Sequence, residues 1–265
     1  MQTAMAMRAS CAALFLLFAA CAQEPAPADA LAAAGDDAAA RAAAVLADPA
    51  RLEADRADDS LRKPANVLAF IDIEPGMKIF EMEAGAGYYT ELFSPLVGPD
   101  GEVVMQNPES FDNFLGDTVP NRVNGRLENV RISKTNFDAL DAADGSIDLV
   151  TWMLGPHELY FTPNGVDTLG DDSGAFAEIM RILKPGGTLI ILDHAAAAGS
   201  PASTGGTLHR IDPALVMQLT EEAGFKMTGE SDVLRNPDDQ LDVGVFDPLV
   251  RRKTDRFLFK FKKPE

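Results

Sequence analysis

The sequence predicts an α/β protein with a mostly parallel seven-stranded sheet, helices on both of its faces and an antiparallel last strand. Three observations support this prediction. From Val67 onwards, short apolar runs alternate with helix-length segments, which is typical of a parallel sheet covered on both faces. The apolar run at 78–82 ends beside acids and is followed by Gly85 and Gly87, which predicts a tight strand-to-helix turn. The run at 256–262 alternates phenylalanine with other residues, which predicts a last strand with one strongly apolar face.

The individual elements follow from these periodicities and from turn residues. A helix is expected to begin at Asp212-Pro213, an N-cap followed by proline, and to end at Gly224. The loop 195–207 consists almost wholly of Ala, Gly, Ser, Pro and Thr and follows a central strand, so it is either a lid or a simple connector. Strands are expected at 78–82, 102–106, 130–133, 147–153, 188–192, 226–234 and 256–262.

Length and charge limit the classes of function. The 265 residues suffice for one sizeable domain and an N-terminal extension. The formal net charge of -18 opposes nucleic-acid binding, which depends on neutralising phosphates with Lys and Arg. Basic residues gather only in the last segment, 251–263, where a solvated strand face explains them. We therefore expect a small-molecule substrate and no nucleic-acid partner.

The N-terminal segment is typical of an export signal. Arg8 precedes an apolar run at 12–20 that has the length of a signal-peptide core. The sequence Phe18-Ala19-Ala20-Cys21 resembles a bacterial lipobox, which predicts a signal peptide over 1–21 and a membrane tether through lipidated Cys21. Cleavage after Ala22 is the alternative. Either way, the chain is expected to be exported to the periplasm.

Two further segments are predicted after the signal peptide. Residues 22–60 are rich in Ala, Asp and Pro and are expected to form a linker and then a helix over 36–57. Residues 61–265 are expected to form the catalytic domain. The two cysteines, Cys11 and Cys21, both precede this domain, so cysteine chemistry is not expected in it.

The glycine pair at 85 and 87 indicates a Rossmann-like nucleotide site. Dinucleotide enzymes use three glycines in the pattern G-x-G-x-x-G, but the third position here is Thr90. S-adenosylmethionine has no phosphate and needs glycine for close backbone approach to its ribose and methionine. The loop therefore favours S-adenosylmethionine over a dinucleotide.

Several motifs, in this order, give the chain its resemblance to a known family: Arg62-Lys63-Pro64, Pro75-Gly76-Met77, residues 81–91, Gln106-Asn107-Pro108, His157-Glu158-Leu159, Leu183-Lys184-Pro185-Gly186-Gly187, His209-Arg210-Ile211, Ala223-Gly224-Phe225 and Lys253-Thr254-Asp255-Arg256-Phe257. From residue 62 to the C-terminus the sequence resembles the class I S-adenosylmethionine-dependent methyltransferases, specifically a bacterial branch with export signals. The resemblance implies the class I methyltransferase fold, S-adenosylmethionine as cofactor and in-line methyl transfer to an unidentified small molecule. Two positions depart from the general pattern: Glu83 replaces a glycine, and Gln106-Asn107 replace the acid that usually binds the ribose hydroxyls.

The resemblance also implies a set of cofactor-binding residues: Glu81, Gly85, Gly87, Tyr88, Tyr89, Asn107 and Asp138. Glu81 would hold the loop or the methionine amino group, Asn107 a ribose hydroxyl and Asp138 the adenine amino group. Packing is the favoured alternative for the two tyrosines. The alternative for Asp138 is a surface-loop acid, and the alternative for Glu81 is an acid that interacts with the amides of the following turn.

Histidines and one arginine are the candidates for chemistry. His157 follows the fourth strand, and with His209 it is expected to accept the proton released by the methylated group, as a catalytic residue. His194 and Arg210 are predicted to bind the substrate, Arg210 through a carboxylate or phosphate. The alternatives are that His157 bonds a neighbouring loop and that Arg210 pairs with an acid such as Asp212. No metal is expected, because no two histidines have metal-ligand spacing.

Two other functions remain open. An exported protein that keeps this fold and binds a small ligand without turnover is favoured by Glu83 and by the missing acid at 106–107. A dinucleotide-dependent oxidoreductase is disfavoured by Thr90.

Overall fold

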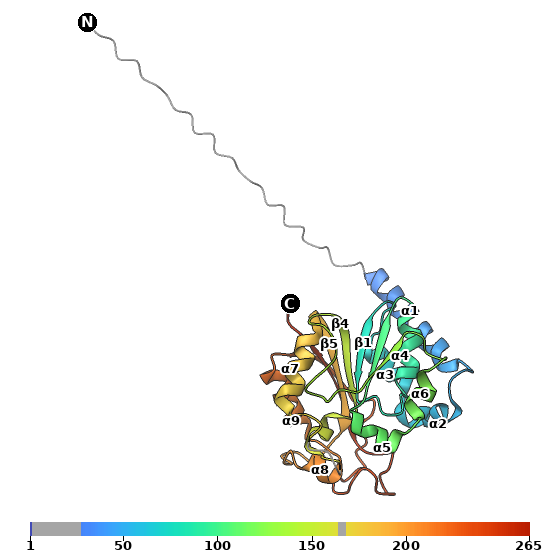
Figure 1. Cartoon of the computed structure of the whole chain (residues 1–265), viewed down its shortest axis with the longest axis vertical. Helices are drawn as coiled ribbons and strands as arrows, with labels where there is room; N and C mark the ends of the chain where they lie inside the picture. Colours follow the sequence, from blue (N-terminus) through green and yellow to red (C-terminus); the bar gives the residue numbers. More distant parts are fainter. Residues whose placement is uncertain (2–27, 164–167) are drawn as a thin grey trace.

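The computed structural model of the chain describes Met1 and residues 28–163 and 168–265 (Figure 1). The predicted signal peptide, Cys21 and the start of the predicted linker therefore lie outside the described residues. Among the helices that are described, none is both long enough and apolar enough to cross a membrane.

Helices and strands alternate along the chain. The helices are α1 (Ala28–Ala47), α2 (Glu53–Arg62), α3 (Pro64–Ile71), α4 (Thr90–Val97), α5 (Asp112–Leu115), α6 (Thr118–Val123), α7 (Asp172–Ile182), α8 (Thr204–Leu208) and α9 (Pro213–Glu222), with 3-10 helices η1 (Glu109–Phe111) and η2 (Pro156–Tyr160). The strands are β1 (Lys78–Met82), β2 (Glu102–Gln106), β3 (Val130–Ser133), β4 (Ile147–Met153), β5 (Leu183–His194), β6 (Lys226–Ser231) and β7 (Arg256–Lys262).

The seven strands form one sheet in the order β3-β2-β1-β4-β5-β7-β6. The first five strands pair in parallel, and β7 lies antiparallel between β5 and β6. This arrangement confirms the predicted fold class, including the antiparallel last strand. The carboxyl ends of the parallel strands meet at one edge of the sheet, where α5 and α8 also lie (Figure 1).

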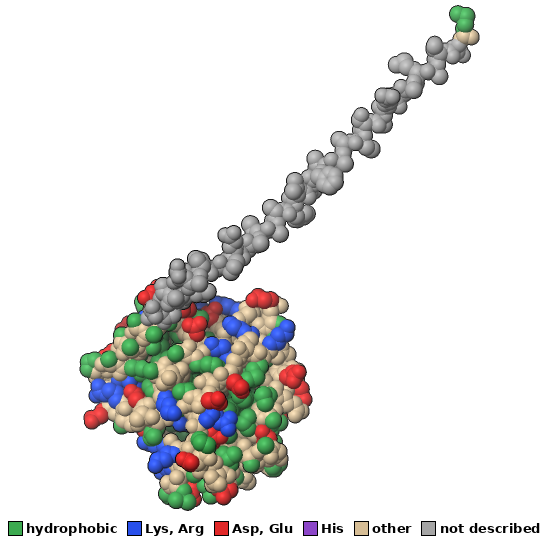
Figure 2. Space-filling view, turned by 180° about the vertical axis from the view of Figure 1, so that it is seen from behind, with side chains coloured by type: hydrophobic (Ala, Val, Ile, Leu, Met, Phe, Trp, Pro, Cys, Tyr) green, Lys and Arg blue, Asp and Glu red, His purple; other side chains and the backbone are tan. Residues whose placement is uncertain are grey.

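Each face of the sheet has its own apolar core, because successive side chains of a strand point to opposite faces. Phe80 of β1 packs with residues of α7 and α9, whereas Ile79 packs with residues of α1, α3 and α4. In Figure 1 these two groups of helices lie on opposite sides of the sheet. The surface view of Figure 2 shows basic and acidic side chains interspersed over one side of the molecule.

Three predicted elements differ in extent from the structure. Strand β5 spans Leu183–His194 and not 188–192, because Leu183 already pairs with Ile147 of β4 and His194 still pairs with Arg256 of β7. Strand β6 ends at Ser231, since the chain turns with a bond from the Arg235 amide to the Asp232 carbonyl. The helix expected over 36–57 is two helices, α1 and α2, separated at Asp48-Pro49, where Asp48 accepts the Ala50 amide in a turn.

The segment predicted as linker and helix contributes to the folded body. Ala42 of α1 belongs to the core on the face of α3 and α4. Asp55 of α2 forms two hydrogen bonds with Arg122, which also pairs with Glu91 of α4. These side chains are nearly buried, so α2 is held by a charge network against the domain it precedes.

Candidate functional site at the carboxyl edge of the sheet

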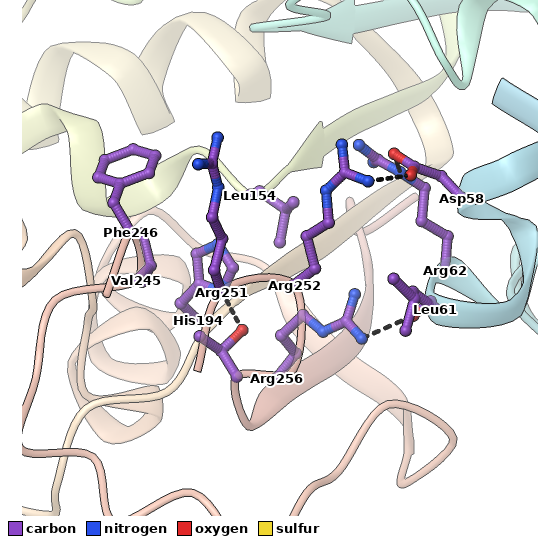
Figure 3. Close-up of a pocket in the computed structure, with 11 residues that line it drawn as sticks. Asp58, Leu61, Arg62, Leu154, His194, Val245, Phe246, Arg251, Arg252 and Arg256 are labelled. Atoms are coloured by element: carbon purple, nitrogen blue, oxygen red, sulfur yellow. Dashed lines mark hydrogen bonds and ion pairs between the residues drawn. The ribbon is translucent and has the colours of Figure 1, made fainter. Parts of the chain in front are cut away.

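A cavity of about 680 Å³ lies at the carboxyl ends of β1 and β4. This volume is within the range of small-molecule sites. It is lined by the β1–α4 loop, by α2, by Phe111 and Phe114, and by residues after β4 and α8. A smaller pocket of about 200 Å³ shares part of this wall, including Arg62, Leu154 and Phe246 (Figure 3).

Glu81 lies near the end of β1, at the base of the larger cavity. Its carboxylate accepts a hydrogen bond of 2.5 Å from the hydroxyl of Thr90, the first residue of α4. Burial raises the pKa of Glu81 to about 8, although the Thr90 bond and the charge of Arg122 oppose this shift. The Glu81 carboxyl is therefore largely neutral near pH 7, and a cationic ligand group beside it would stabilise its ionised form.

The loop after β1 is held by two amide side chains of β2 and its end. Gln106 accepts the Glu83 amide at 2.8 Å, and Asn107 both accepts the Gly85 amide and donates to the Gly85 carbonyl. Gly85 lines the cavity at φ +57°, a conformation that favours glycine. Asn107 therefore acts on the loop, and it is not among the residues that line the cavity. Its predicted contact with a ribose hydroxyl stays a prediction.

Glu83 is a site residue that the sequence analysis treated only as a departure. It lies at φ +49° and lines the cavity, and its carboxylate accepts the Trp152 indole N–H at 3.0 Å. Burial and the nearby charge of Glu158 raise the pKa of Glu83 well above its ordinary value. Gly155 makes room for this carboxylate, because a Cβ there would overlap both Glu83 and Trp152.

Both predicted tyrosines line the cavity. The Tyr88 hydroxyl donates to Asp59 of α2 at 2.6 Å, and the guanidinium of Arg62 lies 4.4 Å from the centre of its ring. Burial raises the pKa of Tyr89 to about 12, so its phenol is neutral. Tyr88 thus holds α2 beside the cavity, whereas Tyr89 packs against Tyr88 and Phe93. The predicted contact of the tyrosines with a sulfonium stays a prediction.

Gly87 has a different neighbour from the one expected. It lies at φ +83°, and a Cβ there would lie 2.5 Å from Cδ of Arg122. This glycine therefore gives space to the charge network beneath the loop, and it is absent from the lining of the cavity.

The two histidines predicted to be catalytic meet at one carboxylate. Glu158 Oε1 lies 3.3 Å from Nε2 of His157 and 3.0 Å from Nδ1 of His209. On its other edge, His157 Nδ1 lies 2.7 Å from Oδ1 of Asp193, a fully buried side chain that also accepts the His157 amide. Glu158 and His209 line the cavity, while His157 lies behind them.

The charges of this cluster support one another. Burial disfavours the charged imidazole, but Asp193 and Glu158 outweigh it and raise the pKa of His157 to about 10. Burial likewise opposes ionisation of Glu158, yet His157 and His209 lower its pKa to about 2. His194, 5.9 Å from His157 between ring centres, has its pKa lowered by burial and by the charge of His157.

Close packing of α8 on η2 brings His209 to Glu158. A Cβ on Gly205 would overlap the carbonyl of His157, and a Cβ on Gly206 would overlap that of Tyr160. His209 follows directly at φ +52°. The small residues of the loop 195–207 therefore serve, in part, to let a helix pack closely.

The smaller pocket is rich in arginine. In Figure 3, the side chains of Arg62 and Arg252 converge on Asp58, with Arg252 at 2.6 Å and Arg62 at 3.6 Å from its carboxylate. Arg256 donates to the Leu61 carbonyl, but its Nε is buried and has no partner in the described part of the chain, and burial lowers its pKa. Arg251 completes the set. His194 also lines this pocket, and its predicted contact with the substrate stays a prediction.

Two predicted site residues have structural roles instead. Arg210 is fully buried and forms a bidentate ion pair with Asp239, at 2.9 and 3.1 Å, so the prediction that it binds substrate is wrong. Asp138 lies in the segment between β3 and β4, where it accepts the amide of Asp171, the residue before α7, at 3.3 Å, and it is not among the residues that line the cavity. Sequence reasoning also missed Asp193, although it directly precedes His194 at the end of a central strand.

Comparisons with known proteins agree with this geometry. Residues 82–191 match the family model of the methyltransferase domain. UbiE of Shewanella sp. strain W3-18-1, a ubiquinone/menaquinone biosynthesis C-methyltransferase, is 33% identical over 119 residues, which are 45% of this chain and 43% of that protein. UbiE of Shewanella oneidensis matches to the same extent. The chain thus spans less than half the length of these curated relatives.

Solved structures share the fold at low identity. A SAM-dependent methyltransferase from Aquifex aeolicus is 19% identical with a TM-score of 0.53, over 77% of this chain and 97% of that one. A chain of the complex between the Haloferax volcanii Trm112 methyltransferase activator and a methyltransferase is 17% identical with a TM-score of 0.55, over 80% and 94%. The matched family and these neighbours indicate S-adenosylmethionine as cofactor, which confirms the cofactor prediction. Residues 82–191 thus match the methyltransferase domain in sequence, and the chain has the class I methyltransferase fold.

Proposed function

We propose that this protein is an S-adenosylmethionine-dependent methyltransferase whose acceptor is a small molecule with an acidic group. The observation that carries the proposal is that two cavities lie side by side and share part of their walls. The larger cavity is lined by the glycine loop after β1, and the smaller pocket beside it is lined by four arginines.

The larger cavity suits the cofactor. Gly85 leaves the wall of this cavity open, since no atom of the described residues lies within 4 Å of the position that a Cβ would take. Phe111 and Phe114, with ring centres 4.8 Å apart, offer apolar surface for a flat base. We assign Glu81, which lines this cavity, to the methionine amino group. Bound there, S-adenosylmethionine would supply an electrophilic methyl group on sulfur, and the walls of the cavity would hold it in line with the acceptor atom.

The smaller pocket suits an anion. Its lining holds Arg62, Arg251, Arg252 and Arg256 but only one carboxylate, that of Asp58. Among the described residues, Arg251 and Arg256 form no ion pair. In a chain of net charge -18, such a local excess of guanidinium groups favours a carboxylate or phosphate ligand.

The curated relatives are C-methyltransferases of ubiquinone and menaquinone biosynthesis. We carry over from them only methyl transfer from S-adenosylmethionine, because the match covers less than half of their length. The prediction that His157 and His209 are catalytic stays a prediction.

Calorimetric titration with S-adenosylmethionine, S-adenosylhomocysteine and NAD tests the cofactor site. We expect binding of the two sulfur nucleosides in the micromolar range and no binding of NAD. Gly85→Val should weaken the binding of S-adenosylmethionine at least thirtyfold. Gly145→Val is the matched control, because Gly145 has the same φ of +57°, has no neighbour within 4 Å and lies before β4, at the opposite edge of the sheet.

The same titration separates the competing functions. Absence of binding by both sulfur nucleosides would support an exported protein that keeps the fold without turnover, whereas binding of NAD alone would support an oxidoreductase. Release of S-adenosylhomocysteine in the presence of a panel of carboxylates and phosphates, with their uncharged amides as controls, then tests the acceptor class. Arg251→Gln should raise KM for an acidic acceptor about tenfold, whereas Arg131→Gln, on β3, should not.

We also propose export and lipidation at Cys21, which rests on the apolar run after Arg8 and on the lipobox-like sequence. Labelling of cells with radioactive palmitate should label the wild-type chain and not Cys21→Ser. An unlabelled protein that begins at Gln23 would instead support cleavage after Ala22.

A further inference from the structure

The cluster of His157, Glu158 and His209 has the geometry of a metal site. Each residue offers one ligand atom, and these three atoms lie within 4.8 Å of one another. Two ligands that are about 2.0–2.2 Å from a tetrahedral ion lie about 3.4 Å apart. The distances from Glu158 Oε1 to the two imidazole nitrogens, 3.3 and 3.0 Å, are close to this value.

The surroundings of His157 match those of a metal-binding imidazole. Asp193 contacts Nδ1 of the ring at 2.7 Å and accepts the backbone N–H of the same residue, so the orientation of the ring is fixed from behind. Nε2 is thereby directed at Glu158. A carboxylate behind a histidine is the usual outer partner of a metal-bound imidazole.

Glu158 is incompletely satisfied without an ion. Its Oε1 contacts both histidines, but its Oε2 is buried and has no hydrogen-bond partner among the described residues. An unpaired buried carboxylate oxygen is costly. Coordination of an ion by one or both oxygens would provide the partner that the buried Glu158 carboxylate lacks.

The ligand set and the exposure of the cluster indicate which kind of ion would bind. We propose that His157 Nε2, Glu158 and His209 Nδ1 bind one divalent first-row transition-metal ion of the zinc type. Two histidines and one carboxylate suit such ions, and three protein ligands leave at least one position open. Since Glu158 and His209 line the larger cavity, that position faces the space assigned to the ligands.

This inference does not depend on methyltransferase activity. It differs from the expectation drawn from the sequence, which considered only ligands a few residues apart on one helix. Here the packing of α8 on η2 brings a ligand from 51 residues away.

The test is titration of the untagged, metal-stripped full chain with ZnCl2 by calorimetry and with CoCl2 by visible absorption. We expect one ion per chain with submicromolar affinity for zinc, and cobalt absorption bands of a four- or five-coordinate site. His209→Ala and Glu158→Gln should each lower the affinity for zinc at least a hundredfold. His194→Asn is the matched control and should change the affinity less than threefold, because His194 Nδ1 contacts Thr254 and lies outside the ligand set.

Thermal unfolding separates loss of the site from loss of the fold. Zinc should raise the unfolding midpoint of the wild type and of His194→Asn, but not of His209→Ala or Glu158→Gln, each of which should still unfold cooperatively. Substoichiometric binding by the wild type would overturn the proposal. So would unchanged affinity in the two ligand variants, or an equal loss in His194→Asn.

Discussion

Replacing Glu81 by glutamine should stabilise the protein in a manner that depends on pH. The folded state raises the pKa of this carboxyl from its ordinary 4.5 to about 8, so it favours the neutral form. Below pH 4.5 the carboxyl is neutral in both states and costs nothing. As pH rises towards 8, the unfolded chain ionises freely while the folded chain holds its proton, so the wild type loses stability. At about 1.4 kcal/mol for each pH unit between the two values, the loss reaches about 5 kcal/mol.

Glutamine keeps the acceptor for the Thr90 hydroxyl but cannot ionise, so Glu81→Gln avoids this loss. Urea unfolding of both proteins at pH 5.0 and 8.5 measures the effect. The free energy of unfolding of the variant, relative to the wild type, should be several kcal/mol higher at pH 8.5 than at pH 5.0. An equal difference at the two pH values would refute the assignment of Glu81 as a buried carboxyl with a raised pKa.

Binding of S-adenosylmethionine should change the ionisation state of Glu81. If the amino group of S-adenosylmethionine pairs with Glu81, binding at pH 7 drives ionisation and releases a proton. Titrations in buffers of different ionisation enthalpy should show this proton for the wild type and not for Glu81→Gln. Identical proton counts would mean that the amino group lies elsewhere.

Three further changes test the walls of the site and its support. Deletion of 1–62 should weaken S-adenosylmethionine about tenfold or more, because it removes the α2 wall, whereas deletion of 1–27 should not; equal affinities would show that α2 is dispensable. Arg210→Met should lower the free energy of unfolding by about 3–5 kcal/mol in urea, because it leaves Asp239 buried and unpaired; a loss below about 1 kcal/mol would contradict the structural role. Phe114→Ala should raise the Kd of S-adenosylmethionine about three- to tenfold at an unchanged thermal midpoint, because this ring is 67% exposed and lines the cavity; a lower midpoint would indicate a packing role.

Local sequence was sufficient for most of the fold. Five strands have the predicted limits, because each is a short apolar run bounded by turn residues. The exceptions depend on residues distant in sequence. Strand β5 starts early because Leu183 pairs with Ile147 of β4, and no local sequence pattern indicates this pairing. The break at Asp48-Pro49 was readable in principle, since proline rarely continues a helix.

The part of the site formed by residues adjacent in sequence could be predicted, whereas the part formed by residues from distant segments could not. The loop 81–91 carries its own signal in the glycines, and the structure places Glu81, Gly85, Tyr88 and Tyr89 around one cavity. Arg210 was misassigned because its partner, Asp239, lies 29 residues further along the chain. A buried charged side chain requires a partner of opposite charge, but the local sequence does not indicate which residue the fold brings next to it.

Glu83 shows how a departure from a pattern is accommodated. A non-glycine residue at φ +49° costs about 1–2 kcal/mol. The structure offsets this cost with two specific bonds, from the Glu83 amide to Gln106 and from the Trp152 indole to the Glu83 carboxylate. Gly155 provides the space for that carboxylate, so three positions distant in sequence are adapted to one glutamate. The carboxylate lines the same cavity as Glu158 and His209, so the structure accommodates this departure from the general pattern within the wall of the site.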